Sequence, residues 1–171
     1  MNTNSLLSKI ETSFGELKSS SAFKYYFSGN LSENREVIEK MALLETYRSL
    51  NLQFESIRIT LFPLGSEHYF PTSYKSDNIL LLSDENGANL SLIEVRTVPT
   101  KTATVLSRDL SMLKFLLDRA FIQLGVIILI GLTSEKMREK VEMLVKKWQP
   151  KEENKLVVYS FNERFEVKKT S

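Results

Sequence analysis

Cysteine is absent from this chain of 171 residues, and histidine occurs once, at His68. The lack of cysteine excludes disulfides, zinc–thiolate sites, iron–sulfur clusters and cysteine nucleophiles. The single histidine excludes a metal site built on two histidines. Any bound metal therefore needs oxygen ligands, which favours magnesium, manganese or calcium. A Gly-x-x-x-x-Gly-Lys phosphate loop is also missing, so the sequence does not indicate nucleotide hydrolysis of that kind.

Long apolar segments are missing as well. The longest one runs from Leu124 to Leu132 and is broken by glycines, whereas a helix needs about 20 apolar residues to cross a bilayer. The N-terminus lacks the continuous apolar stretch of a signal peptide. We therefore expect no membrane association and a cytoplasmic location.

The composition, with 42% hydrophobic and 26% charged residues, is typical of one globular domain. The net charge of +2 is too small to favour any partner, but it is unevenly distributed. Residues 1–95 carry 8 basic and 12 acidic side chains, and residues 96–171 carry 15 basic and 9 acidic ones. Such asymmetry is typical either of a side that faces a polyanion or of two differently solvated faces.

Hydrophobic periodicity predicts the elements of the fold. Helical spacing indicates helices near residues 6–17, 35–50, 107–121 and 135–148, and apolar or alternating runs indicate strands at 56–62, 78–83, 90–98, 126–130 and 156–161. Because a helix lies between the third strand and the wholly apolar fourth, we expect a crossover, and hence an α/β domain with helices on both faces of a central mixed β-sheet. We predict a core over residues 35–161, an N-terminal helical extension over 1–34, and a loose charged tail over 162–171.

The predicted hairpin brings charged side chains together. Asn86-Gly87 is a strong hairpin signal because both residues tolerate positive φ. A four-residue turn over 84–87, with the pairing centred between residues 85 and 86, places Asp77 opposite Glu94. Arg96 shares that face by the two-residue period of a strand.

Two interpretations of this cluster stay open. Two nearby carboxylates repel one another unless a cation lies between them, and a divalent metal ion meets that need while it activates a bound water. The alternative is that Arg96 simply pairs with Glu94 or Asp77 on a solvated strand.

These residues resemble the restriction-endonuclease-like superfamily of nucleases, called PD-(D/E)XK. That core consists of a helix, a strand, a hairpin that carries Asp and then Glu-x-Lys, a crossover helix and a buried strand. Ser76-Asp77 stands at the Pro-Asp position and Glu94-Val95-Arg96 at the Glu-x-Lys position, while residues 108–115 and 125–128 look similar to the crossover helix and the buried strand. The resemblance covers residues 35–131. Arg96 replaces the family's lysine, and arginine cannot serve as a general base, although it can orient a water or stabilise charge.

The resemblance implies an endonuclease that hydrolyses phosphodiester bonds in DNA with Mg²⁺ or Mn²⁺. Asp77 and Glu94 are then the metal ligands, with Arg96 as a third catalytic residue. The superfamily often adds a glutamate from the first core helix, and Glu39 is our candidate for that third ligand. A homodimer or a partner subunit is expected for two-strand cutting. The alternative is a catalytically inactive protein of the same fold that acts as a nucleic-acid-binding or protein-assembly module.

Overall fold

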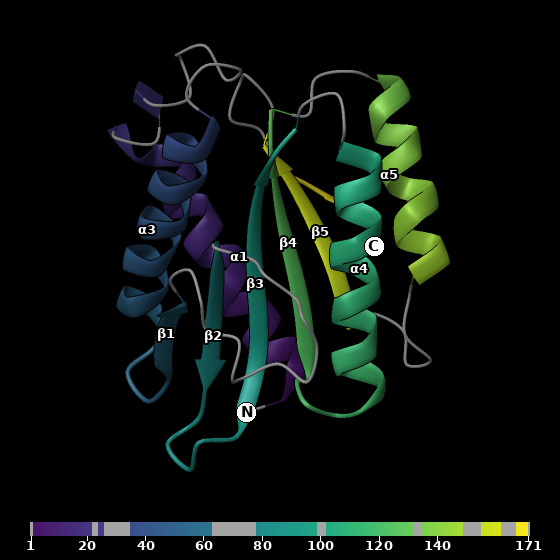
Figure 1. Ribbon diagram of the computed structural model, residues 1–171. Helices are drawn as coiled ribbons and strands as arrows, with labels where there is room; N and C mark the ends of the chain where they lie inside the picture. The colour runs from purple at the N-terminus through teal and green to yellow at the C-terminus, as the bar shows by residue number, and fades with distance from the viewer. Residues whose placement is uncertain are drawn as a thin grey trace.

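Figure 1 shows the computed structural model of the chain, in which helices flank a six-stranded sheet. The structure describes residues 2–21, 24–25, 35–62, 78–98, 102–131, 135–148, 155–161 and 167–170. Within these ranges the helices are α1 (Thr3–Ser19), α3 (Arg35–Gln53), α4 (Thr102–Asp118) and α5 (Glu135–Trp148). The strands are β1 (Arg58–Phe62), β2 (Ile79–Ser83), β3 (Asn89–Thr97), β4 (Leu124–Ile130), β5 (Leu156–Phe161) and β6 (Val167–Thr170).

The strands lie in the sheet in the order in which they occur in the chain. β1, β2 and β3 form an antiparallel meander, β3, β4 and β5 are parallel, and β6 pairs antiparallel with β5. α4 and α5 supply the crossovers that parallel neighbours require. The predicted mixed α/β sheet is therefore confirmed.

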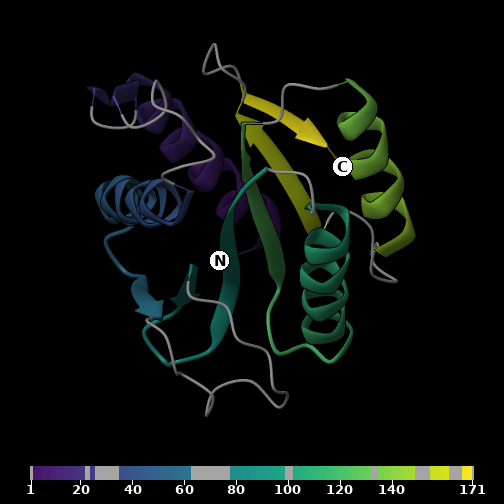
Figure 2. The same ribbon diagram turned by 45° about the horizontal axis from the view of Figure 1, so that its top comes forward.

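Helices cover both faces of this sheet, as Figure 2 shows, with α1 and α3 on one face and α4 and α5 on the other. Side chains of the central strands alternate between two cores because successive residues of a strand point to opposite faces. In β4, for example, Val126 and Ile128 pack with α1 and α3, whereas Ile127 and Leu129 pack with α4 and α5. The N-terminal segment predicted as an extension contributes α1 to the first of these cores.

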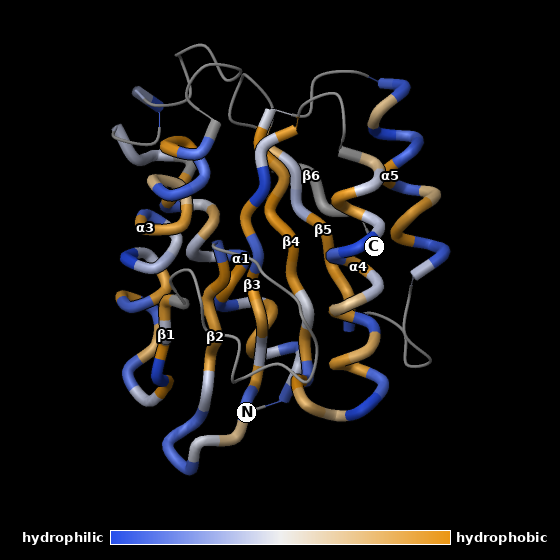
Figure 3. The backbone as a smooth tube through the Cα atoms, viewed as in Figure 1, coloured by the Kyte–Doolittle hydropathy of each residue, from blue (hydrophilic) through white to orange (hydrophobic). Residues whose placement is uncertain are grey.

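Polar residues interrupt the apolar centre of the sheet. Every residue of β4 and β5 is buried, and both strands are buried on two faces as parallel strands usually are. β3 is buried from Leu90 to Thr97 as well, but this stretch includes Glu94 and Arg96. Figure 3 shows the resulting hydrophilic stretch in the upper part of β3.

α4 begins and ends earlier than its sequence indicated. We expected a helix over 107–121, but the helix starts at Thr102, and buried Leu106 extends its apolar stripe toward the N-terminus. At its other end Ala120 adopts a left-handed conformation with φ 56°. The amide of Phe121 then donates to the Leu116 carbonyl, at 2.9 Å, in a Schellman-type ending.

The last strand corrects the expectation of a loose tail. Residues 167–170 form β6 and pair with residues 158–161 of β5. A charged composition concealed this strand, because an edge strand needs no apolar face of its own when its backbone pairs with a buried neighbour.

The register of the β2–β3 hairpin also differs from the prediction. Glu94 lies opposite Ile79 rather than opposite Asp77, and the pairing shifts between Leu82 and Ser83. The turn explains the difference, since the Asp84 side chain accepts hydrogen bonds from the amides of Asn86 and Ala88, at 2.9 and 2.8 Å. This wider turn and the bulge move the register by two residues for Ile79 to Leu82, so the side chains of this stretch and of Ser91 to Glu94 keep their expected faces.

Candidate functional site

The predicted pair of Glu94 and Arg96 is present, and helix α4 adds a third charged group. The Arg96 guanidinium donates from Nη2 to Glu94 Oε1 and from Nε to Asp109 Oδ2, the latter at 2.9 Å. Glu94 and Arg96 share a face of β3 by the two-residue strand period. Asp109 reaches them from α4, which packs on that face. We call Glu94, Arg96 and Asp109 the ion cluster.

The ion cluster is buried. Glu94 and Asp109 are 0% exposed, and Arg96 is 9% exposed. Its two carboxylates and one guanidinium leave one negative charge uncompensated among the three. Arg108, whose side chain is 57% exposed, lies 3.4 Å from Asp109 Oδ1 and brings a second positive charge to the rim. Because unpaired buried charge is strongly destabilising, each member of the ion cluster depends on the others.

Asp109 was not among the predicted site residues, although the sequence holds a signal for it. The buried stripe of α4 runs through Leu106, Leu110 and Leu113. Position 109 falls on that stripe at helical spacing, so an aspartate there faces the core and needs a partner.

Glu39, the third expected metal ligand, contacts the other face of the sheet. Its Oε1 accepts hydrogen bonds from the amide and the hydroxyl of Thr97, both at 2.8 Å, and its Oε2 accepts one from Asn78 Nδ2, also at 2.8 Å. Thr97 points away from the face of Glu94 and Arg96 because it is an odd-numbered neighbour on the same strand. We call Glu39, Asn78 and Thr97 the amide cluster.

One oxygen in the amide cluster has no partner among the described residues. Asn78 is 4% exposed, and its Oδ1 accepts no hydrogen bond there. An unsatisfied buried acceptor costs about 1–3 kcal/mol, so such an atom is a natural place for a water or a cation.

The expected metal set of Asp77, Glu94 and Glu39 remains a prediction. Asp77 lies outside the described residues. Within the described ranges, no three or more acidic or histidine side chains gather as a possible metal site. Glu94 is not available as a metal ligand while Arg96 bridges it to Asp109. In contrast, the carboxylate of Glu39 and the Oδ1 atom of Asn78 are oxygen ligands of the kind that Mg²⁺ binds.

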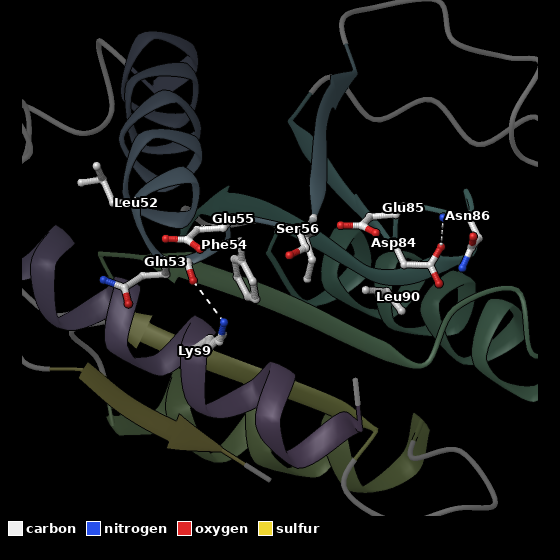
Figure 4. Close-up of a pocket in the computed structure, with 11 residues that line it drawn as sticks. Lys9, Leu52, Gln53, Phe54, Glu55, Ser56, Asp84, Glu85, Asn86 and Leu90 are labelled. Atoms are coloured by element: carbon white, nitrogen blue, oxygen red, sulfur yellow. Dashed lines mark hydrogen bonds between the residues drawn. The ribbon is translucent and has the colours of Figure 1, made fainter.

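A pocket of about 600 Å³ lies at the opposite end of β3, beside the hairpin turn (Figure 4). Phe54 and Lys9 line one side of it and the turn residues Asp84, Glu85 and Asn86 line the other, with the Asp84 carboxylate turned toward Asn86. Lys9 Nζ donates to the Gln53 carbonyl at 3.3 Å and lies 5.1 Å from the centre of the Phe54 ring. Lys9 thus links α1 to the C-terminal end of α3, and the pocket lies where these helices meet the hairpin turn. It shares no residue with the ion cluster.

Comparisons with family models, with curated proteins and with solved structures find no match for this chain. Among the described residues, no helix is both long enough and apolar enough to cross a membrane.

Proposed function

We propose that this chain is a nucleic-acid-binding domain with a nuclease-like arrangement of elements, which binds without hydrolysing. The observation that carries the proposal is that Arg96 donates to both Glu94 and Asp109. Arginine keeps its proton at all accessible pH values, so Arg96 is a fixed cation that occupies both carboxylates where a metal ion or a lysine would otherwise take part in hydrolysis.

The element order supports the relationship to that fold. α3, β1, the β2–β3 hairpin, α4 and β4 follow one another in the order that the resemblance implies. Glu94 and Arg96 lie in the second hairpin strand. The excess of basic side chains in residues 96–171 supports a polyanionic partner.

A second candidate function, metal-dependent hydrolysis of DNA, is favoured by the amide cluster. Glu39 and the orphan oxygen of Asn78 are oxygen ligands at the end of the hairpin, and Asp77 precedes Asn78 in the chain. Mg²⁺ or Mn²⁺ bound there would polarise a phosphodiester and activate a water.

One experiment separates the two candidates. The wild type, Asp77→Asn and Arg96→Lys are assayed for binding and cleavage of plasmid and single-stranded DNA, first with magnesium and then with manganese. We expect the wild type to bind and not to cut. Cleavage that Asp77→Asn abolishes and Arg96→Lys retains would establish the second candidate instead, and a wild type that binds no nucleic acid would refute the proposal.

A magnesium-dependent shift in melting temperature provides an independent check. An ion that binds only the folded state stabilises it by mass action. The binding proposal expects no shift. A rise for the wild type that is absent for Asp77→Asn and Glu39→Gln would again favour the second candidate.

A further inference from the structure

A groove of about 540 Å³ runs between α4 and α5, on the side of the sheet that holds the ion cluster. Figures 1 and 2 show these helices side by side. The α4 wall consists of short side chains and one cation, and α5 contributes Leu144 and Trp148. The α4 residues are Ala103, Thr104, Ser107, Arg108 and Ser111. Short side chains with hydroxyl groups let a polar ligand approach the helix closely.

Positive charge borders this groove on the α5 side. Lys136, Lys140 and Lys147 are exposed and recur at spacings of four and seven residues, which places them on one face of the helix. Leu144 of the groove lies four residues after Lys140 and three before Lys147, so these two lysines flank it. We call the three residues the lysine stripe.

The acidic residues of α5 lie elsewhere on the helix. Glu135, Glu139 and Glu142 also recur at spacings of four and three, and helical geometry turns their stripe about a third of a turn away from the lysine stripe. From the other wall, Arg108 adds a side chain that is 57% exposed. Positive charge is therefore concentrated at the groove even though α5 as a whole carries both signs.

The dimensions and charge of the groove favour one strand of nucleic acid. From position 103 to position 111 the α4 wall extends about 12 Å at 1.5 Å per residue, which corresponds to roughly three phosphates along one strand. Packed helices have axes about 8–10 Å apart, so the groove between them is too narrow to receive a duplex.

We propose that the α4–α5 groove binds the phosphodiester backbone of a single-stranded nucleic acid, through Arg108, Lys140 and Lys147. This inference rests on the proposed binding function and adds its location. Thr104 lines the groove one helical turn before Arg108, and hydroxyl groups are common partners of phosphate oxygens.

The single tryptophan of the chain reports directly on the groove. Trp148 Nε1 donates to Ser107 Oγ at 3.1 Å, and Lys147 Nζ lies 5.3 Å from the centre of its ring. A phosphate that draws Lys147 away from the ring changes the surroundings of the indole, so binding should change the tryptophan fluorescence.

The test titrates the full chain with oligodeoxythymidylate while tryptophan fluorescence and the anisotropy of a labelled oligonucleotide are followed. The groove variant carries Arg108→Ala, Lys140→Ala and Lys147→Ala. Its charge-matched control carries Lys40→Ala, Arg48→Ala and Arg58→Ala, which are exposed positions on α3 and β1. A further variant carries only Lys140→Ala and Lys147→Ala, both at exposed positions. It tests the groove without Arg108→Ala, which removes a contact to buried Asp109 and could impair folding.

We expect the groove variant to bind at least tenfold more weakly, with the control close to the wild type. The slope of log K against log salt should fall by about 0.7 for each cation removed, the usual value for single strands. If the wild type, the groove variant and the double-lysine variant bind the oligonucleotide equally well, the groove is not the binding site, although the proposed binding function stands. No binding by the wild type would refute the binding function itself. Inorganic phosphate that changes the fluorescence as strongly as the oligonucleotide, at equal phosphate concentration, would overturn the assignment to a nucleic-acid strand.

Discussion

The two faces of β3 satisfy buried carboxylates by different means. On the face of α4 and α5, Glu94 and Asp109 are paired with the charged guanidinium of Arg96. On the face of α1 and α3, Glu39 accepts hydrogen bonds from neutral donors of Thr97 and Asn78. The ion cluster sets two carboxylates against one internal cation, whereas Glu39 in the amide cluster accepts hydrogen bonds from N–H and O–H groups.

This difference indicates which cluster tolerates change. Removal of Arg96 from the ion cluster leaves buried charges without their partner, while removal of Glu39 from the amide cluster leaves the polar donors of Thr97 and Asn78 unsatisfied. The ion cluster is therefore suited to hold α4 against β3, and the amide cluster has an oxygen left over for a further ligand.

The largest effect is expected from Arg96→Met, which removes the guanidinium that pairs with both Glu94 and Asp109 and leaves only the exposed Arg108 beside Asp109. We expect a loss of about 3–5 kcal/mol in the free energy of unfolding, measured by urea denaturation. The matched control is the triple change Glu94→Leu, Arg96→Met and Asp109→Leu, which removes all the charges together and should cost far less. A single variant as stable as the triple one would show that the ion cluster is not electrostatically coupled.

A smaller loss, about 2–3 kcal/mol, is expected from Glu39→Ala, because it leaves the neutral donors of Thr97 and Asn78 without their acceptor. Glu39→Gln should cost less than Glu39→Ala. If the side-chain amide of Asn78 rotates so that Oδ1 and Nδ2 exchange positions, Oδ1 can accept a hydrogen bond from the glutamine amide at position 39. Amide hydrogen exchange at Thr97 reports the same bond. Comparable losses for Glu39→Gln and Glu39→Ala would mean that the charge of Glu39, and not its hydrogen-bonding geometry, matters.

Tyr159 offers a pH-dependent test on the face of α1. Its hydroxyl donates to Glu11 at 2.7 Å. Burial, reinforced by the hydrogen bond to Glu11 and by its charge, raises the pKa of Tyr159 far above its usual value near 10. The unfolded chain releases this proton near pH 10 and the folded chain keeps it, so Tyr159 contributes stability that is fully present below pH 10 and is lost as the pH rises further.

Tyr159→Phe should therefore cost about 1.5 kcal/mol at pH 7, for a hydrogen bond to a charged group, and the difference from the wild type should shrink above pH 10. Urea denaturation of both proteins at pH 7, 9 and 10.5 measures the trend. A difference that stays constant up to pH 10.5 would contradict the raised pKa of Tyr159.

The smallest effect is expected from an exposed pair on α4. Lys114 Nζ lies 2.8 Å from Asp118 Oδ2 at a spacing of four residues. Lys114→Ala should cost about 0.3–0.5 kcal/mol, and 0.5 M sodium chloride should remove most of that cost. A cost close to that of Arg96→Met would show that burial does not separate the two kinds of ion pair.

Prediction from sequence was accurate where the signal is local. The apolar runs of β4 and β5 are recognisable because a strand buried on both faces carries little else. The shared face of Glu94 and Arg96 follows from the strand period alone. In contrast, the hairpin register depends on a bulge between Leu82 and Ser83. The free energy of that bulge is set by the pairing of both strands, so a local pattern does not predict it.

The amino-acid sequence by itself therefore determined the element order, the mixed sheet and the neighbouring positions of Glu94 and Arg96, because propensity and periodicity act over a few residues. Only the tertiary structure decided that Asp109 completes the ion cluster, that Glu39 reaches the opposite face, and that residues 167–170 add an edge strand. Each of these depends on which surface packs against which, and that is settled by contacts between residues far apart in the chain.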